Sequence, residues 1–339
     1  MKPCYIHSAV SISAQNTFDG ELFLNTIKEH GSDKAEAIYP NYRDYISPAM
    51  LRRMATGVKM GVTAGEKALQ LAALENPDAI ITGTGMGCIE DTEKFLNSII
   101  NNKEEYLTPT SFIQSTHNTV GAQIALGLKC KGHNQTFVNG SSSFESALLD
   151  GQLLLSENDA KTVLVGGVDE MGKEFVDYVQ LMEDKLKNGI KVPFGEGASF
   201  FVLSSNERKD AIQLLDVEIM NSIPKSEIAS KLSLFLMNNH LEPESIDALV
   251  LGYNGDGFDN YYDEASTLFS NATQVKYKHL SGEFFTASAF GLYIATQILK
   301  HQDIPTTLIQ NGGNSKKIET ILLYNQFKGR DHSFILLQK

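Results

Sequence analysis

Residues 136–148 read TFVNGSSSFESAL, and the interpretation of the whole chain starts from them. An apolar segment leads into Gly140 and three serines, and an apolar pattern follows, which predicts a strand, a tight turn and a helix. Ser141, Ser142 and Ser143 would then lie at the start of the helix, where serine commonly accepts hydrogen bonds from unpaired backbone N–H groups. We therefore expect these serines to cap the helix.

A serine nucleophile in this turn is the alternative. The nucleophile turn of α/β-hydrolases needs the pattern G-x-S-x-G, and Ser142 has Gly140 before it but Phe144 where the second glycine should stand. A hydroxyl also needs a neighbouring base to become nucleophilic, and the sequence assigns no histidine clearly to that role. Capping is therefore the favoured interpretation.

Composition and charge exclude several classes of partner. The chain has 339 residues, a net charge of −12 and a pI near 5.2, which argues against nucleic acid or an anionic membrane surface. It contains no run of 18 apolar residues and no secretion signal, so we expect no membrane span and a cytoplasmic location. Three scattered cysteines and eight single histidines form no metal-binding motif, so we expect neither a metal nor a cofactor.

Short, continuous apolar segments alternate with helical patterns, which predicts an α/β protein whose strands are buried on both faces. The most polar junction is SNERKD at 205–210, and it predicts two halves, 1–205 and 206–339. The expected strands are 79–85, 163–168, 198–203, 248–252 and 333–337, with a helix at 90–102.

The segment GTGMG at 83–87 follows a predicted strand and precedes a predicted helix, so a phosphate loop has to be weighed. Its spacing is G-x-G-x-G rather than G-x-G-x-x-G, and the chain has no G-x-x-x-x-G-K-[ST] motif. A tight turn that requires glycine is the better interpretation.

The 136–148 segment resembles the strand, turn and helix that carry the nucleophilic cysteine of the β-ketoacyl synthases, in the thiolase superfamily. Other segments resemble that family in the same order along the chain. The resemblance implies a thiolase-like α/β fold of two pseudo-duplicated βαβ halves, layered α/β/α/β/α. The further matching segments are 51–54, 120–132, 165–170 and 193–198, the last containing the family's G-E-G-A.

The family's three reactive positions are all replaced here. Gly140, or Ser141 one place on, stands at the cysteine. In GYNGDG at 252–257 the glycine spacing places Asn254 at the first catalytic histidine, with Tyr253 as the alternative. In KHLSGE at 278–283 Glu283 stands at the second histidine.

Some neighbours of these positions are kept. Lys278 matches the family's lysine, and Phe327 matches one phenylalanine of its C-terminal gate, which is otherwise degraded. His279 follows the lysine directly and would point to another face of a strand, so we interpret it as structural. The family's acylated group and its two enolate-stabilising histidines are thus missing, and we expect no catalytic residue.

The resemblance to a silent ketosynthase implies a chain-length factor of the type found in polyketide and aryl-polyene systems. Its partner would be an active ketosynthase, in a heterodimer formed around residues 110–150. An acyl carrier protein is itself acidic, so it would dock mainly on that partner, although Arg52 and Arg53, with Lys59, offer a small basic patch. The alternatives are an active condensing enzyme or acyltransferase that uses Ser141 or His279, and a module that only binds an acyl ligand.

Overall fold

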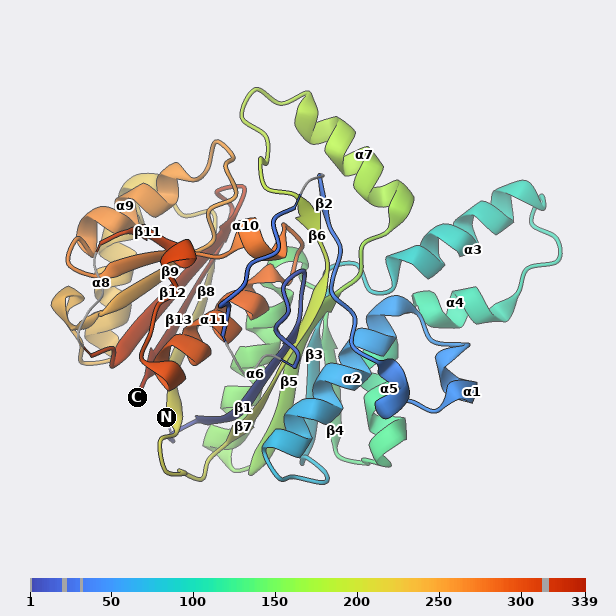
Figure 1. Ribbon diagram of the computed structural model, residues 1–339, viewed down its shortest axis with the longest axis horizontal. Coiled ribbons are helices and arrows are strands. Elements are labelled where there is room, and N and C mark those ends of the chain that lie inside the picture. The colour runs from blue at the N-terminus through green and yellow to red at the C-terminus, as the bar shows by residue number, and fades with distance from the viewer. Residues whose placement is uncertain (1, 20–22, 31–32, 313–316) are drawn as a thin grey trace.

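A computed structural model describes residues 2–19, 23–30, 33–312 and 317–339. Eleven strands form one sheet in the order β11-β10-β9-β12-β13-β8-β1-β7-β5-β3-β4, and β2 pairs with β6 in a small second sheet (Figure 1). The strands are β1 (Tyr5–Ile12), β2 (Lys34–Ala35), β3 (Ala79–Gly83), β4 (His133–Phe137), β5 (Thr162–Asp169), β6 (Phe194–Gly195), β7 (Gly197–Ser204), β8 (Ile212–Asn221), β9 (Ala248–Leu251), β10 (Thr273–Lys276), β11 (Ile309–Asn311), β12 (Thr320–Phe327) and β13 (Asp331–Gln338).

Helices cover both faces of the large sheet. The α-helices are α1 (Pro48–Leu51), α2 (Thr56–Leu71), α3 (Ile89–Asn101), α4 (Pro109–Ser115), α5 (Thr119–Leu128), α6 (Ser143–Glu157), α7 (Lys173–Asp184), α8 (Ile228–Asn238), α9 (Asn260–Leu268), α10 (Lys278–Ser281) and α11 (Ala287–His301). The 3-10 turns are η1 (Tyr42–Asp44), η2 (Gly140–Ser142), η3 (Lys225–Glu227), η4 (Pro243–Ser245) and η5 (Thr306–Leu308).

The sheet contains the same topology twice. The order β4-β3-β5-β7-β1 in the first half matches β10-β9-β12-β13-β8 in the second. In each half the first three of these strands run parallel and the last two are antiparallel to their neighbours. The halves join where β1 pairs antiparallel with β8, at Tyr5 with Gln213 and Ile6 with Ile212. β7 ends at Ser204 and β8 begins at Ile212, but the domain boundary itself remains a prediction.

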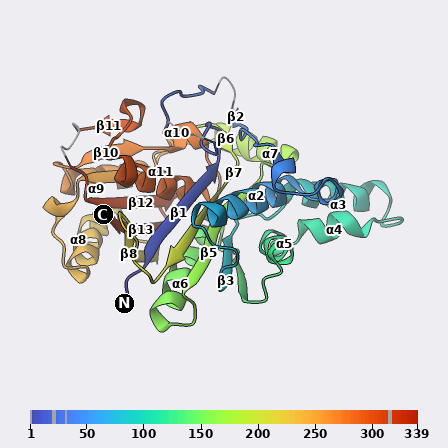
Figure 2. The same ribbon diagram turned by 60° about the horizontal axis from the view of Figure 1, so that its bottom comes forward.

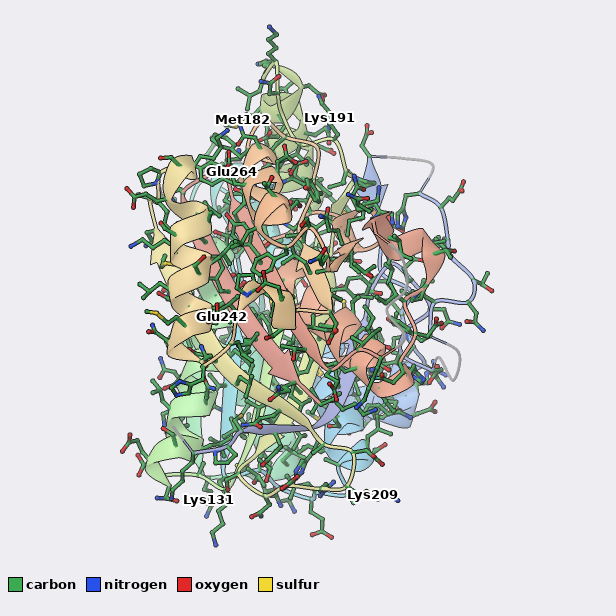
Figure 3. The ribbon with its side chains drawn as sticks, turned by 90° about the vertical axis from the view of Figure 1, so that its left-hand side faces the viewer. Lys131, Met182, Lys191, Lys209, Glu242 and Glu264 are labelled. Atoms are coloured by element: carbon green, nitrogen blue, oxygen red, sulfur yellow. The ribbon has the colours of Figure 1, made fainter. Side chains whose placement is uncertain are left out.

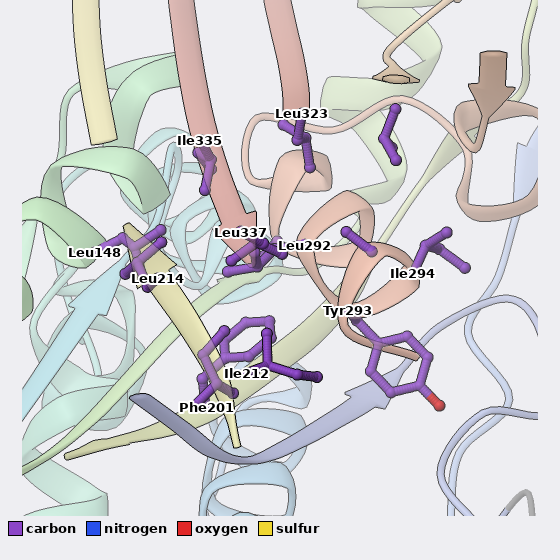
Figure 4. Close-up of a cluster of buried hydrophobic side chains, with 14 of the residues drawn as sticks. Leu148, Phe201, Ile212, Leu214, Leu292, Tyr293, Ile294, Leu323, Ile335 and Leu337 are labelled. Carbon is purple, nitrogen blue, oxygen red and sulfur yellow. The ribbon is translucent and has the colours of Figure 1, made fainter. Parts of the chain in front are cut away.

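The layers follow from three separate hydrophobic clusters. One lies between α2, α5 and the first half of the sheet, and another between α8, α9 and the second half. The largest lies between the two halves, where α6 and α11 are enclosed (Figures 1 and 2; Figure 4 shows part of this cluster). Residues 287–299 of α11 are all buried, as expected of a helix that packs on every side. This arrangement is the α/β/α/β/α fold predicted from the sequence.

The predicted strands and the helix at 90–102 are confirmed, with ends shifted by a few residues, and all five strands are buried almost throughout. One local expectation is wrong: Lys278 and His279 lie on the short helix α10 rather than on a strand. The helix that follows begins at Ala287, with Thr286 at its N-cap position.

The glycine turn at 83–87 holds a carboxylate of the protein itself. Asp169, at the end of β5, accepts hydrogen bonds at Oδ1 from the Thr84 hydroxyl (2.8 Å) and from the backbone N–H of Gly85 (2.8 Å) and Met86 (3.2 Å). Its Oδ2 accepts from both the N–H and the hydroxyl of Thr286, each at 2.9 Å. These bonds occupy the donors that a phosphate would need, and they tie the turn in the first half to the start of α11 in the second.

Phe200 on β7 packs against three glycines of the first half. It is fully buried, and its ring fills space that Gly166 on β5 leaves open, since a Cβ there would lie 2.4 Å from the ring. Gly61 and Gly65 on α2 also face this ring, at 3.7 Å from where their Cβ atoms would be. The three glycines therefore make room for one phenylalanine.

We expect Phe200→Ala to lower the free energy of unfolding by about 3–5 kcal/mol, because it leaves a cavity that rigid strands cannot close. Urea denaturation followed by circular dichroism measures this change. Phe112→Ala is the matched control, since the side chain of Phe112 is 54% exposed and its removal should cost less than about 1 kcal/mol. Equal losses in the two variants would contradict the packing argument.

Glu170 joins the N-terminal ends of two helices. Its carboxylate accepts hydrogen bonds from the backbone N–H of Gly57 in α2 (2.5 Å) and of Glu90 in α3 (2.9 Å). Burial nevertheless raises the pKa of Glu170 to about 7, because desolvation outweighs these two bonds. The folded protein thus favours the protonated form, and the stability this provides is lost as the pH rises from below 4.5 through 7.

We therefore expect the free energy of unfolding to fall between pH 5 and pH 8, and Glu170→Gln to remove up to roughly 3 kcal/mol of that fall. Urea denaturation at the two pH values measures both quantities. Glu75→Gln, at an exposed position, is the control and should keep the pH dependence of the original chain. If Glu170→Gln keeps it too, the assignment to Glu170 is wrong.

Candidate functional site

The turn at 138–143 has room for a side chain that the sequence does not supply. It connects the edge strand β4 to α6 through η2, and Gly140 there has a φ of +57°, in the left-handed region that favours glycine. No atom lies within 4 Å of the point where a Cβ on Gly140 would be placed. A residue larger than glycine would fit at this point at the cost of backbone strain.

The serines beside Gly140 are held by bonds inside the protein. The Ser143 hydroxyl accepts from the Asn139 N–H (2.9 Å) and donates to the Gly140 carbonyl (2.7 Å). No side chain caps α6, so the expectation of serine capping is wrong: Ser143 closes the preceding turn instead.

Ser141 lacks a base. Its hydroxyl donates to Oδ2 of Asp331 (2.7 Å), and the Arg330 guanidinium holds both oxygens of the same carboxylate (2.8 and 2.9 Å). Partial burial raises the pKa of Asp331, but the bonds from Arg330 and Ser141 outweigh it and leave this pKa below its usual value. A carboxylate with a lowered pKa is a poor proton acceptor, so Ser141 is not activated.

Asn254, Lys278 and Glu283 form one buried cluster. The Lys278 ammonium lies 3.0 Å from each oxygen of Glu283, and Asn254 Nδ2 donates to Oε2 of Glu283 (2.8 Å). Each of the three residues is less than 5% exposed. Asn254 Oδ1 in turn accepts from the Asp256 N–H (3.1 Å), so the polar atoms of the cluster satisfy one another.

The backbone around this cluster fixes its geometry. The Glu283 N–H donates to the Pro193 carbonyl (2.7 Å), and the Gly195 N–H donates to the Glu283 carbonyl (3.0 Å). Gly195 belongs to the G-E-G-A segment, and a Cβ on it would lie 2.2 Å from the Ser281 carbonyl oxygen. This close approach explains why a glycine is needed at that point.

Tyr253, the alternative to Asn254, and His279, the alternative reactive residue, both lie apart from this cluster. The Tyr253 hydroxyl donates to Asp263 (3.1 Å) on α9, so Asn254 rather than Tyr253 takes part in the cluster. His279 Nε2 is bonded to the Thr307 carbonyl (3.2 Å), and burial lowers the pKa of His279 to about 4. Its ring is therefore neutral at pH 7 and engaged in a structural contact.

An apolar cavity of about 90 Å³ adjoins the cluster, with Glu283 in its wall. Phe327 lines it, and the rings of Phe327 and Phe285 pack at 5.6 Å between centroids. The next residue, Lys328, forms an ion pair with the buried carboxylate of Glu183 on α7, which closes one side. Other lining residues are Met86, Ile89, Phe175, Val176, Val179, Ile190 and Phe194.

Sequence reasoning missed two buried groups near these positions. Glu145 on α6 is fully buried, with the Ser333 hydroxyl 3.0 Å from one oxygen, and burial raises its pKa. Glu145 lies three residues before Leu148, on the apolar side of the predicted helix, and this position was a signal. The ion pair of Lys328 with Glu183 joins segments far apart in the chain, and no local sequence pattern predicts it.

Arg52 and Arg53 are exposed at the end of α1, and Lys59 is half-buried on α2. Within the described ranges, no three histidine, cysteine, aspartate or glutamate side chains are grouped so that they could bind a metal ion. In the same part of the chain, no helix has the length and apolar character that a membrane span requires.

Comparison with known proteins gives one family and one fold. Residues 29–193 match the family model of the beta-ketoacyl synthase N-terminal domain. No curated protein matches the chain. One similar solved structure is the ishigamide ketosynthase/chain length factor, with a TM-score of 0.81 and 16% identity over 100% of this chain and 99% of that one. A second is AntDE:AntF, a type II PKS acyl-carrier protein in complex with its ketosynthase bound to the hexaketide, with a TM-score of 0.79 and 15% identity over 100% of this chain and 99% of that one. A third is the ketosynthase ApeO with its chain length factor ApeC from Xenorhabdus doucetiae, with a TM-score of 0.76 and 15% identity over 99% of this chain and 98% of that one.

The family match and the fold agree with the resemblance read from the motifs. The matched segment includes the turn at Gly140 and ends at Pro193, beside the Glu283 cluster. The structural matches span essentially the whole chain. The chain is thus related to the β-ketoacyl synthase family through residues 29–193, and it has the thiolase-like ketosynthase fold along its whole length.

Proposed function

We propose that this chain is a non-catalytic ketosynthase-like subunit, a chain-length factor, which pairs with an active ketosynthase and shapes the tunnel for its growing acyl chain. The observation that carries the proposal is the buried cluster of Lys278, Glu283 and Asn254. The fold is retained, while the positions at which the family resemblance expects reactive groups hold residues that are engaged in hydrogen bonds within the protein.

The chemistry of condensation explains why this cluster would be inactive. The reaction needs a thiolate to carry the acyl chain and hydrogen-bond donors to stabilise the enolate that forms on decarboxylation. Gly140 has no nucleophile, and Ser141 is bonded to a carboxylate already paired with Arg330. Glu283 would oppose a developing negative charge, and the donors of Lys278 and Asn254 are directed at Glu283.

The cavity beside the cluster supports a role in shaping an acyl tunnel. Its wall is mostly apolar, and the packed rings of Phe285 and Phe327 form part of it. An acyl or polyene chain gains free energy by leaving water for such a surface. The product would be of the polyketide, aryl-polyene or fatty-acid type.

Exposed apolar side chains support pairing with a second subunit. Helices α3 and α4 extend away from the body of the molecule in Figure 1 and expose Leu96, Ile100, Phe112 and Ile113 to water. Nearby, β4 is an edge strand with one neighbour, so its outer backbone groups are open to another strand. Two of the similar structures are described as pairing a ketosynthase with a chain length factor.

An acidic carrier protein would then act mainly through the active subunit. The net charge of −12 repels another acidic protein at long range, and Arg52 and Arg53 form only a small exposed patch. The rival proposal of an unorthodox active enzyme requires acyl transfer to the chain itself. A lone acyl-binding module would differ in having no ketosynthase partner.

We expect the intact mass of the chain to stay unchanged after incubation with acyl- and malonyl-loaded carrier protein, while an active ketosynthase in the same tube gains an acyl group. Gly140→Cys should gain one acyl group, because space for a side chain exists and the start of α6 lowers the pKa of a thiol. Ser141→Cys, beside Asp331, is the matched control and should gain none. An acyl adduct on the unaltered chain would refute the non-catalytic assignment.

We expect the chain to co-purify with an active ketosynthase of the same organism, and Phe112→Glu with Ile113→Glu to reduce the recovered partner at least tenfold, because charges in a buried apolar interface are costly. Size-exclusion chromatography and quantitative mass spectrometry measure the ratio. Leu71→Glu, at the end of α2, is the control because Leu71 is equally exposed (58%). Undiminished pairing of the double variant would place the interface elsewhere, and no partner at all would favour the acyl-binding module.

A further inference from the structure

Helix α7 has an apolar face wider than the part that the protein covers. Phe175, Val176 and Val179 turn inward and line the cavity. Tyr178, Leu181, Met182 and, just past the helix, Leu186 are 52–67% exposed. Leu181 and Met182 lie three and four residues after Tyr178, which places these three residues along one side of the helix, and Leu186 follows just past its end. We call these four residues the α7 stripe.

Lysines surround one end of the α7 stripe. The segment 185–191 reads KLKNGIK, so Lys185, Lys187 and Lys191 add three positive charges and no carboxylate to a chain whose net charge is −12. All three are exposed, and among the described residues no carboxylate oxygen lies within salt-bridge distance of them. Figure 3 shows Met182 and Lys191 at the same end of the molecule.

The segment that carries these lysines is fastened to the body of the protein. The N–H groups of Lys191 and Val192 both donate to the Asn254 carbonyl (2.8 and 3.1 Å), and the Gly257 N–H donates to the Asn188 carbonyl (3.0 Å). The pair of Glu183 with Lys328 anchors the end of α7 as well. Little conformational freedom would be lost on binding, which favours recognition.

We propose that the α7 stripe and its three lysines form a docking surface for an acidic amphipathic helix of a partner protein. An apolar stripe along one helix is complementary to the apolar side of a second helix. The lysines would then meet acidic residues beside that apolar side, which adds specificity at close range, where the local charges outweigh the long-range repulsion from the net charge of −12. This surface is separate from the α3 and α4 surface proposed for the ketosynthase.

The charges on α7 favour a protein over an anionic membrane. Glu174, Asp177 and Asp184 are exposed on the same helix, and a flat anionic bilayer would bring them against its headgroups. By the same spacing Glu174 lies on the line of Tyr178 and Met182, and Asp177 and Asp184 flank Leu181, so the acidic residues of a partner helix are expected to meet the lysines beyond the last turn of α7. The exposed acids are also engaged within the protein: Asn97 donates to Glu174, Lys34 pairs with Asp177, and Gln180 donates to Asp184.

Binding of two fluorescent helical peptides to the full chain tests the proposal. Both carry leucines along one side; one has glutamates flanking them and the other has lysines. We expect the acidic peptide to bind at least tenfold more tightly, as measured by fluorescence anisotropy. Leu181→Asp with Met182→Asp should weaken it at least tenfold, whereas Leu71→Asp should leave it unchanged.

Charge reversal provides the second test. Replacing Lys185, Lys187 and Lys191 with Glu should reverse the preference, so that the lysine peptide binds more tightly. Circular dichroism confirms that each variant is folded, and the assay needs no ketosynthase, so its result is independent of the proposed function. Equal binding of the two peptides would overturn the proposal. If the unaltered chain binds phosphatidylcholine vesicles containing 20% phosphatidylglycerol and the same variants lose that binding, the proposal is overturned in favour of a membrane surface.

Discussion

The buried ammonium of Lys278 is the constraint on which the centre of this structure depends. A charge removed from water is strongly unfavourable unless an opposite charge and hydrogen bonds compensate it. Glu283 supplies both oxygens, and Asn254 completes the bonds of that carboxylate. Removing either partner would leave the other charged and uncompensated, so lysine, glutamate and asparagine at these three positions depend on one another.

The duplicated topology explains how distant segments meet at this cluster. Asn254 follows β9 and Glu283 follows α10 in the second half, while Pro193 and Gly195 belong to the first half and bind the backbone of Glu283. Asp169 makes a similar connection from β5 to the start of α11. The region between the halves is therefore held by hydrogen bonds at defined points as well as by the apolar contacts of α6 and α11.

Much of this arrangement could be predicted from the sequence, because apolar strands and glycine turns are local signals. The buried strands and the turn at Gly140 are predicted in this way. The helical turn at Lys278 was missed, since four residues carry too little periodicity to separate helix from strand. Serine capping of α6 was wrong because the Ser143 hydroxyl accepts its hydrogen bond from the Asn139 N–H, which precedes the helix, rather than from an N–H group of α6.

The pairs that define the cavity were beyond sequence reasoning for a different reason. Glu183 and Lys328 are far apart in the chain, and only the closed fold brings them together beside Phe327. Their pairing holds α7 against the segment around Phe327, which resembles the C-terminal gate of the ketosynthases. The hydrogen-bonded cluster of Lys278, Glu283 and Asn254 lies on one side of the cavity and the anchored helix α7 on the other, so contacts within the protein hold the cavity wall in place. A fixed apolar wall is what a subunit needs if it contributes shape, rather than reactive groups, to a shared tunnel.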